Sequence, residues 1–143
     1  MKDIQIRPYS PNDYVSVRRN MEEGGLYYPE IDAEQKLNEK ITRNPGSILV
    51  AELNGEVVGN VLIMEDGWGP FFFRLAVAKE YRHKGIGSRL VGEVEDILAI
   101  KGYREVYCLV KDNDTELKEY YKERGFKEGD TPYRVMLKGI ERR

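Results

Sequence analysis

The chain has 143 residues, with 23 Lys or Arg against 25 Asp or Glu and a formal net charge of −2. This balance argues against nucleic acid as a partner, because nucleic-acid binding needs a basic face, and without a long apolar segment we expect no membrane partner. One cysteine cannot form an internal disulfide, which favours the cytoplasm, and the length predicts a single domain over residues 1–143.

The first third of the chain predicts one strand and two helices. Residues 4–8 alternate apolar and polar side chains, as a half-buried strand does. Ser10 followed by proline is typical of a helix start, and a second helix is expected to begin at Asp32. Between the helices, residues 22–30 carry two glycines, two tyrosines and several acids. This segment favours either a mobile loop with an aromatic wall or a helix stop with a hydrophobic anchor.

The middle of the chain predicts strands joined by tight turns. Asn54-Gly55 separates the apolar runs 48–53 and 56–64, and this dipeptide is the strongest short signal for a β-hairpin. A glycine-rich turn at residues 66–70, which contains the single tryptophan, leads into a Phe-rich strand at residues 71–77. We therefore expect consecutive strands of one sheet.

The Phe-rich strand is followed by a basic turn with two glycines, formed by Arg82, His83, Lys84, Gly85, Ile86, Gly87 and Ser88. Glycine allows a close backbone approach, and the free N–H groups of a helix start attract anions. The turn thus predicts a diphosphate site, although such a pattern alone also fits a simple strand end. No P-loop motif is present, and Leu90 stands where a dinucleotide fingerprint needs glycine.

The remaining elements complete a mixed α/β pattern. Apolar residues at helical spacing predict a helix from residue 86 to Lys101-Gly102. Residues 105–110 predict a buried strand, parallel to the Phe-rich strand through a right-handed crossover. A helix around residues 114–124 and a last strand at residues 133–137 follow.

Two motifs in this order resemble the GCN5-related N-acetyltransferase (GNAT) superfamily. The turn from Arg82 to Gly87 matches [RQ]-x-x-G-x-[GA], and the helix that ends at Tyr121-Lys122-Glu123-Arg124-Gly125-Phe126 matches YxxxGF. The resemblance implies a mixed α+β domain, in which a central, mostly antiparallel sheet contains one parallel, splayed strand pair and about four helices flank it. The chain departs from the family pattern at the position seven residues before the tyrosine, where the family often has Asn. Asp114 occupies that position and Asn113 precedes it, and we assign the cofactor contact to Asn113 while leaving Asp114 open.

The resemblance also implies the chemistry. Acetyl-CoA is the expected cosubstrate, with its diphosphate on the backbone of the turn and its pantetheine arm paired with Leu75, Ala76 and Val77. Tyr121 is the implied general acid for the departing thiolate, with a packed aromatic as the alternative, and Tyr120 is expected to face the core. No metal is expected. Because the arm needs a free strand edge, strands 71–77 and 105–110 should pair near Phe72 and separate by Ala76–Val77.

The general base is not identified by the sequence. The single histidine, His83, lies inside the turn, and the strand at residues 71–77 carries no carboxylate. Candidate bases are Glu65, Asp66 and the acids of residues 22–30, with a water relay as the alternative.

Three further residues have two interpretations each. Arg74 is suited to an acceptor carboxylate or to a partner within the sheet. Trp68 either shapes an acceptor cleft or covers the core. Cys108 is expected to be a buried thiol, because nucleophilic catalysis would need a nearby histidine.

The leading hypothesis is an acetyl-CoA-dependent N-acetyltransferase that transfers acetyl directly to a primary amine of a protein, peptide or small molecule. The alternatives are transfer of a longer acyl group and a non-catalytic acyl-CoA-binding or sensor module. A nucleic-acid-binding domain is disfavoured by the net charge of −2. The sequence does not identify the acceptor, and a homodimer stays open.

Overall fold

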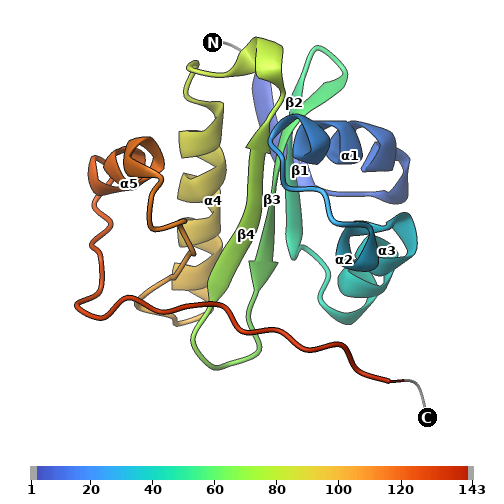
Figure 1. Cartoon of the computed structure of the whole chain (residues 1–143). Coiled ribbons are helices and arrows are strands. Elements are labelled where there is room, and N and C mark those ends of the chain that lie inside the picture. The colour runs from blue at the N-terminus through green and yellow to red at the C-terminus, as the bar shows by residue number, and fades with distance from the viewer. Residues whose placement is uncertain (1–2, 142–143) are drawn as a thin grey trace. The chain divides into compact units, whose positions relative to one another are not determined.

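The computed structural model describes residues 3–141. The chain forms two compact units, residues 1–108 and residues 109–143. The first unit contains, in chain order, β1 (Ile4–Pro8), a 3-10 turn (Pro11–Asp13), α1 (Tyr14–Glu23), α2 (Pro29–Asp32), α3 (Glu34–Arg43), β2 (Ile48–Leu53), β3 (Glu56–Met64), β4 (Phe71–Val77), a 3-10 turn (Lys79–Tyr81) and α4 (Ile86–Ile100) (Figure 1). The second unit contains α5 (Thr115–Lys122).

The four strands form one antiparallel sheet in the order β1-β2-β3-β4. The predicted hairpin joins β2 and β3, with Asn54 at φ 52° and Gly55 at φ 81°. Two consecutive left-handed residues are what a type I′ turn requires, because its twist matches that of the flanking strands. The mixed α/β class predicted from the sequence is confirmed.

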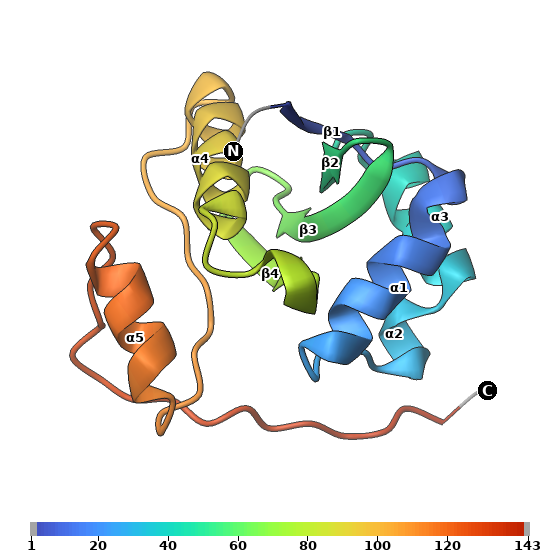
Figure 2. The same ribbon diagram turned by 90° about the horizontal axis from the view of Figure 1, so that it is seen from above.

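The sheet of the first unit is covered on both faces. Seen from above, α1, α2 and α3 lie on one side of the sheet and α4 on the other (Figure 2). The buried side chains include Val17, Met21 and Leu37 from the first group of helices and Leu90 and Val94 from α4. The sheet therefore separates two apolar layers, and α4 packs directly on one of its faces.

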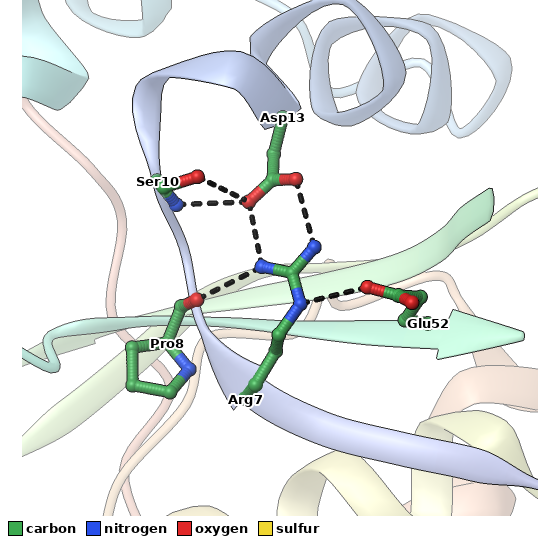
Figure 3. A network of polar contacts seen from close by, with 5 residues as sticks. All are labelled: Arg7, Pro8, Ser10, Asp13 and Glu52. Carbon is green, nitrogen blue, oxygen red and sulfur yellow. Dashed lines mark hydrogen bonds and ion pairs between the residues drawn. The ribbon is translucent and has the colours of Figure 1, made fainter. Parts of the chain in front are cut away.

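A charged network fixes the start of α1 to the sheet (Figure 3). The Arg7 guanidinium donates to both carboxylate oxygens of Asp13 at 2.9 Å and, through Nε, to Glu52 Oε1 at 2.8 Å. Asp13 also accepts the Ser10 N–H at 2.8 Å. Burial acts to raise the pKa of Asp13, but the hydrogen bonds from Arg7 and Ser10 outweigh it and the pKa lies below its usual range. The network thus joins β1, β2 and the first turn of α1.

The predicted second helix begins at Glu34, as α3, instead of at Asp32, and the short helix α2 precedes it at the end of the predicted loop. Ala33 between them has φ −62° and ψ 155°, an extended conformation. The preceding Asp32 is buried, and its carboxylate accepts the Tyr28 N–H at 2.8 Å and contacts Arg74 of β4. The chain bends at this point because Asp32 is directed into the protein, which sequence periodicity does not reveal.

Two predicted strands do not form. Within residues 105–108 the pairing with β4 is a single parallel bridge between Phe71 and Tyr107, and residues 133–137 have no regular structure. Beyond this bridge residues 105–108 do not pair with β4, whose register with β3 shifts between Phe73 and Ala76. Residues 133–137 have strand-like composition, but residues 109–141 contain no strand that could supply hydrogen-bond partners.

The second unit is built around α5. The Asp114 carboxylate caps the helix by accepting the Leu117 N–H at 3.0 Å. At the other end Gly125 adopts φ 93°, and the Phe126 N–H donates to the Tyr121 carbonyl at 3.1 Å. The YxxxGF motif therefore has a local structural basis, because its glycine permits the turn that returns the Phe126 ring to within 5.1 Å of the Tyr121 ring.

Candidate active site

The turn after β4 has the geometry of an anion site. His83 has φ 63° and Gly85 has φ 83°, so the backbone turns sharply before α4 begins at Ile86. The Arg89 N–H donates to the Gly85 carbonyl at 3.1 Å, which makes Gly85 the first acceptor of the helix. The N–H groups of Ile86 and Gly87 consequently have no acceptor inside α4, and they lie at the positive end of its dipole. The side chains of His83 and Lys84 are exposed beside them.

Arg82 has a structural role within the same turn. Its Nε donates to the Val77 carbonyl at 3.0 Å, and its Nη2 donates to the Glu23 carbonyl at 3.1 Å. The Glu23 carboxylate in turn accepts the Lys79 N–H at 2.8 Å. The guanidinium expected to lie beside a phosphate therefore joins the turn to β4 and to the end of α1. It adds positive charge to the site while its donors hold the backbone in place.

A β-bulge interrupts β4 just before the turn. Leu62 pairs with Phe73 and Asn60 pairs with Ala76, so two residues, Arg74 and Leu75, lie opposite Val61 alone. Arg74 has φ 57°. Such a left-handed conformation is rare for a residue other than glycine and marks a locally strained backbone.

The bulge determines which backbone groups reach the open edge of β4. The Ala78 N–H donates to the Val58 carbonyl at 2.7 Å, so by alternation Ala76 faces β3 and Val77 faces the edge. The Arg74 carbonyl accepts the Asn60 side-chain amide at 2.9 Å and therefore points inward. Because C=O and N–H lie on opposite sides of a trans peptide, the Leu75 N–H points outward. Of the three predicted cofactor residues, Leu75 and Val77 thus face the edge, and Ala76 is directed to β3.

The predicted pairing near Phe72 is confirmed. The Phe72 N–H donates to the Tyr107 carbonyl at 3.0 Å, and the Tyr107 N–H donates to the Pro70 carbonyl at 3.0 Å. Among residues 105–108 this bridge is the only pairing with β4. Residues 105–108 therefore leave the edge at Leu75 and Val77 uncovered.

A cleft of about 710 Å³ lies on the α1–α3 side of the first unit. It is bounded by α2, α3, the end of β3 and the β3–β4 loop, and its lining includes Glu30, Ile31, Lys40, Arg43, Glu65, Asp66, Trp68 and Phe71. Trp68 is 81% exposed, which favours its role as a cleft wall over that of a core cover. Phe71 stacks on Phe73 at 5.8 Å and lies 5.3 Å from Tyr107 between ring centroids. The cleft therefore has an aromatic margin.

The candidate bases differ in their surroundings. The Glu65 carboxylate accepts hydrogen bonds from Lys101 at 2.6 Å, Tyr103 at 2.7 Å and Asn44 at 2.9 Å. These bonds, led by Lys101, lower the pKa of Glu65 to about 2, which makes it a poor proton acceptor near neutral pH. Glu30 and Asp66 are exposed on the same cleft, and they remain the better candidates.

The hydrogen bonds to the Glu65 carboxylate predict how the stability of the protein changes at acidic pH. Its carboxylate has a folded-state pKa below the ordinary value of about 4.3, so its stabilising effect is complete above that value and is lost as the pH falls toward 2. Glu65→Gln should lower the unfolding free energy at pH 7 by about 1–3 kcal/mol, the usual range for hydrogen bonds to a charged group. In denaturant melts, the difference from wild type should shrink steadily as the pH falls from 5 to 3. A difference that is constant over this range would contradict the ionised role of Glu65.

The structure also indicates the roles of Arg74 and Cys108. The Arg74 guanidinium contacts both carboxylate oxygens of Asp32 at 3.0–3.1 Å, which favours the interpretation of Arg74 as a structural partner over that of an acceptor ligand. Burial raises the pKa of the Cys108 thiol to about 11. The thiol is therefore neutral at physiological pH, as a packing residue is.

In the second unit, Tyr121 is 7% exposed and Tyr120 is half-buried. The expectation that Tyr120 would be the inward residue is therefore wrong, because α5 directs Tyr121 toward Phe126 and places Tyr120 beneath the Arg124 guanidinium at 3.6 Å. Asp114 serves as the helix cap and Asn113 is exposed in the preceding turn. The catalytic role of Tyr121 and the cofactor contact of Asn113 stay predictions.

The bulged strand β4 leads into the glycine-rich start of α4, in the order that the sequence motifs predicted. Residues 14–126 match the Acetyltransferase (GNAT) family. An acetyltransferase of Pectobacterium atrosepticum is 32% identical over 120 residues, which cover 83% of this chain and 85% of that protein. The chain therefore belongs to the GNAT family of acetyltransferases.

Solved structures agree with this assignment. The PaiA N-acetyltransferase of Thermoplasma acidophilum, in complex with coenzyme A, superposes with a TM-score of 0.79 at 26% identity, covering 91% of this chain and 93% of that one. Ard1 of Thermoplasma volcanium superposes with a TM-score of 0.74 at 25% identity, covering 87% and 82% of the two chains. Within residues 3–141 no helix is long and apolar enough to cross a membrane.

Proposed function

We propose that this protein is an acetyl-CoA-dependent N-acetyltransferase that transfers acetyl directly to a primary amine. The proposal rests on one observation: two features that the same ligand needs follow one another directly in the chain. The outward backbone groups of Leu75 and Val77 run directly into the turn and the open start of α4. A strand edge suits the amides of a pantetheine arm, and the helix start suits a diphosphate.

The residues of the turn and of β4 would have distinct tasks. The backbone of residues 83–88 would hold the diphosphate, with charge from Lys84 nearby. The Leu75 N–H is directed to the edge and would donate to the thioester oxygen as it becomes an oxyanion, a contribution typically worth about 3–4 kcal/mol. The Val77 carbonyl already accepts a hydrogen bond from Arg82. The Val77 N–H is therefore the group that would bind the pantetheine arm.

The transfer itself needs two proton movements. The amine nitrogen attacks the thioester carbon, a C–N bond forms, and the C–S bond breaks to release the thiolate. We assign to Tyr121 the proton that neutralises the thiolate, on the strength of the YxxxGF motif. The ammonium proton of the acceptor passes to water or to a carboxylate of the cleft, for which Glu30 and Asp66 are the candidates.

The relatives support the cofactor and the reaction class. The similar Thermoplasma acidophilum protein is an N-acetyltransferase and was crystallised with coenzyme A. We extend both properties to this chain because the turn from Arg82 to Gly87 is present, with His83 and Gly85 at positive φ. A cytoplasmic location and a homodimer stay proposals, to be tested by fractionation and light scattering.

The acceptor is expected to enter the cleft on the α1–α3 side. Glu30 and Asp66 are exposed carboxylates there, Lys36, Lys40 and Arg43 line the same cleft, and Trp68 and Phe71 add apolar surface. The two exposed carboxylates and the aromatic surface suit an amine carried on an apolar skeleton, either a small molecule or a side chain or terminus of a protein.

The single tryptophan offers a direct test of this placement. Because Trp68 is 81% exposed and lines the cleft, an acceptor amine should shift or quench its fluorescence on binding. Glu30→Gln should weaken the titration about 2–5-fold, as the loss of one exposed charge contact does, and Trp68→Phe should remove the signal. An amine that the protein acetylates without any change in Trp68 fluorescence would place the acceptor elsewhere.

A non-catalytic acyl-CoA-binding module is the second candidate. It would use the same turn and strand edge, so cofactor binding does not separate the two functions. What separates them is acetyl transfer to an amine and the effect of Tyr121 on its rate.

A further inference from the structure

A line of buried polar side chains crosses the α1–α3 side of the first unit. Asn20 and Asn60 are 0% exposed and Asp32 is 2% exposed. The Asn20 amide donates to Asn60 at 3.1 Å, and Asn60 donates to the Arg74 carbonyl at 2.9 Å. Asp32 binds the Arg74 guanidinium from the other side. Arg74 is thus held by its main chain and by its side chain at once.

The conformation of Arg74 explains why two anchors are needed. Its φ of 57° lies in the left-handed region, which disfavours residues with a Cβ. The other non-glycine residues of residues 3–141 with positive φ are Asp3, Asn54 and His83, and none of them lies within a strand. A strained residue inside a strand persists only where its surroundings determine it fully.

Relaxation of Arg74 would change the edge of β4. The Leu75 N–H points outward because the Arg74 carbonyl points inward to Asn60. If Arg74 returned to an ordinary extended conformation, the bulge would be lost and the alternation of the following residues would shift by one. Leu75 would then face β3 and Ala76 would face the edge.

Asp32 also acts on the acceptor side. Its carboxylate accepts the Tyr28 N–H at 2.8 Å, and its carbonyl accepts the Tyr14 hydroxyl at 3.0 Å. The Tyr14 hydroxyl lies 3.0 Å from that of Tyr27. The segment with the two tyrosines, which is followed by the cleft residues Glu30 and Ile31, is therefore hydrogen-bonded to Asp32 directly at its carboxylate and, through Tyr14, at its carbonyl.

We propose that the Asp32–Arg74 ion pair is a positioning device that holds the bulge of β4 and thereby aligns the cofactor edge with the acceptor cleft. This inference rests on the proposed function, because it assigns the edge at Leu75 to acetyl-CoA. Asp32 and Arg74 act through the backbone of β4 and touch neither substrate. Asp32 is a buried acid that the proton transfers do not use.

The decisive experiment is a rescue. Asp32→Asn keeps the shape of the side chain but removes the charge that holds Arg74, and acetyl-CoA affinity measured by calorimetry should fall about tenfold. Adding Arg74→Gly should restore most of that affinity, because glycine adopts a positive φ without an ion pair. Adding Arg74→Ala should not restore it, because alanine carries a Cβ at the same position. Equal affinities of the two double variants would overturn the proposal.

A second measurement is independent of the cofactor. In the ligand-free protein, amide exchange at Leu75 followed by NMR should slow in Asp32→Asn, because the N–H turns from the open edge toward β3, and it should return to the wild-type rate in Asp32→Asn/Arg74→Gly. If acetyl-CoA fails to bind to wild type while this exchange pattern appears, the proposed function fails and the positioning role stands. An unchanged Leu75 exchange rate in Asp32→Asn would refute the positioning role itself.

Discussion

Replacing Gly85 by aspartate is expected to abolish acetyl-CoA binding and to leave the fold intact. Gly85 has φ 83°, and a Cβ built on it meets no atom within 4 Å. Aspartate and asparagine tolerate this left-handed conformation better than other residues with a side chain. The added carboxylate, however, would lie beside the open N–H groups of α4, where the diphosphate is expected. Like charges so placed should weaken binding about 100-fold or more.

The matched control is Gly85→Asn. It has nearly the same shape and the same backbone preference as Gly85→Asp, but it carries no charge. Calorimetry should show an affinity for acetyl-CoA near that of wild type for Gly85→Asn, and equal melting temperatures should show that both variants fold. Unchanged affinity in Gly85→Asp would remove the diphosphate from this turn.

Replacing Tyr121 by phenylalanine is expected to lower kcat about 10²–10⁴-fold, the usual contribution of a positioned general acid. The affinity for acetyl-CoA should stay the same. Because phenylalanine keeps the ring that packs 5.1 Å from Phe126, the melting temperature should change little. The phenol starts near a pKa of about 10 and can protonate a thiolate leaving group.

The control for this variant is the neighbouring tyrosine. Tyr120→Phe alters a half-buried ring on the same helix, and it should leave turnover nearly intact. Stopped-flow or steady-state release of coenzyme A with an identified acceptor measures both variants. Full activity in Tyr121→Phe would show that the residue is the packed aromatic of the alternative interpretation.

The elements determined by local chemistry could be predicted from the sequence. The hairpin at Asn54-Gly55 formed because both residues accept positive φ. The helix after the turn spans Ile86–Ile100 as expected, and it ends with Gly102 at φ 96°. In both cases a few adjacent residues specify the backbone, so the local pattern was sufficient.

Features that depend on residues far apart in the chain could not be predicted. Arg74 meets Asp32 across 42 positions, and nothing in the alternation of residues 71–77 indicates a bulge at that point. The same buried Asp32 lies at the break between the unpredicted helix α2 and α3. For Arg82, the motif predicted a place in the turn, but not that its donors are used by Val77 and Glu23.

The two predicted strands that did not form show what composition alone cannot predict. Composition indicates that a segment suits a strand, whereas a ladder of hydrogen bonds also requires a neighbour with a free edge. Residues 105–108 pair with β4 at Tyr107 only, and Tyr133 to Leu137 lie in the segment 109–141, in which no strand forms. Their large side chains, Tyr133, Val135, Met136 and Leu137, are 76–89% exposed.

The central claim is that the protein transfers acetyl from acetyl-CoA to an amine. The most direct measurement is the release of free coenzyme A over a panel of peptides, amino acids, polyamines and aminoglycosides, combined with mass spectrometry of each acceptor. We expect at least one amine to gain a single acetyl group, with an equal amount of coenzyme A released and no reaction by Gly85→Asp. If wild type binds acetyl-CoA but releases no more coenzyme A than Gly85→Asp with every amine, the acetyltransferase account is contradicted and the non-catalytic binding module takes its place.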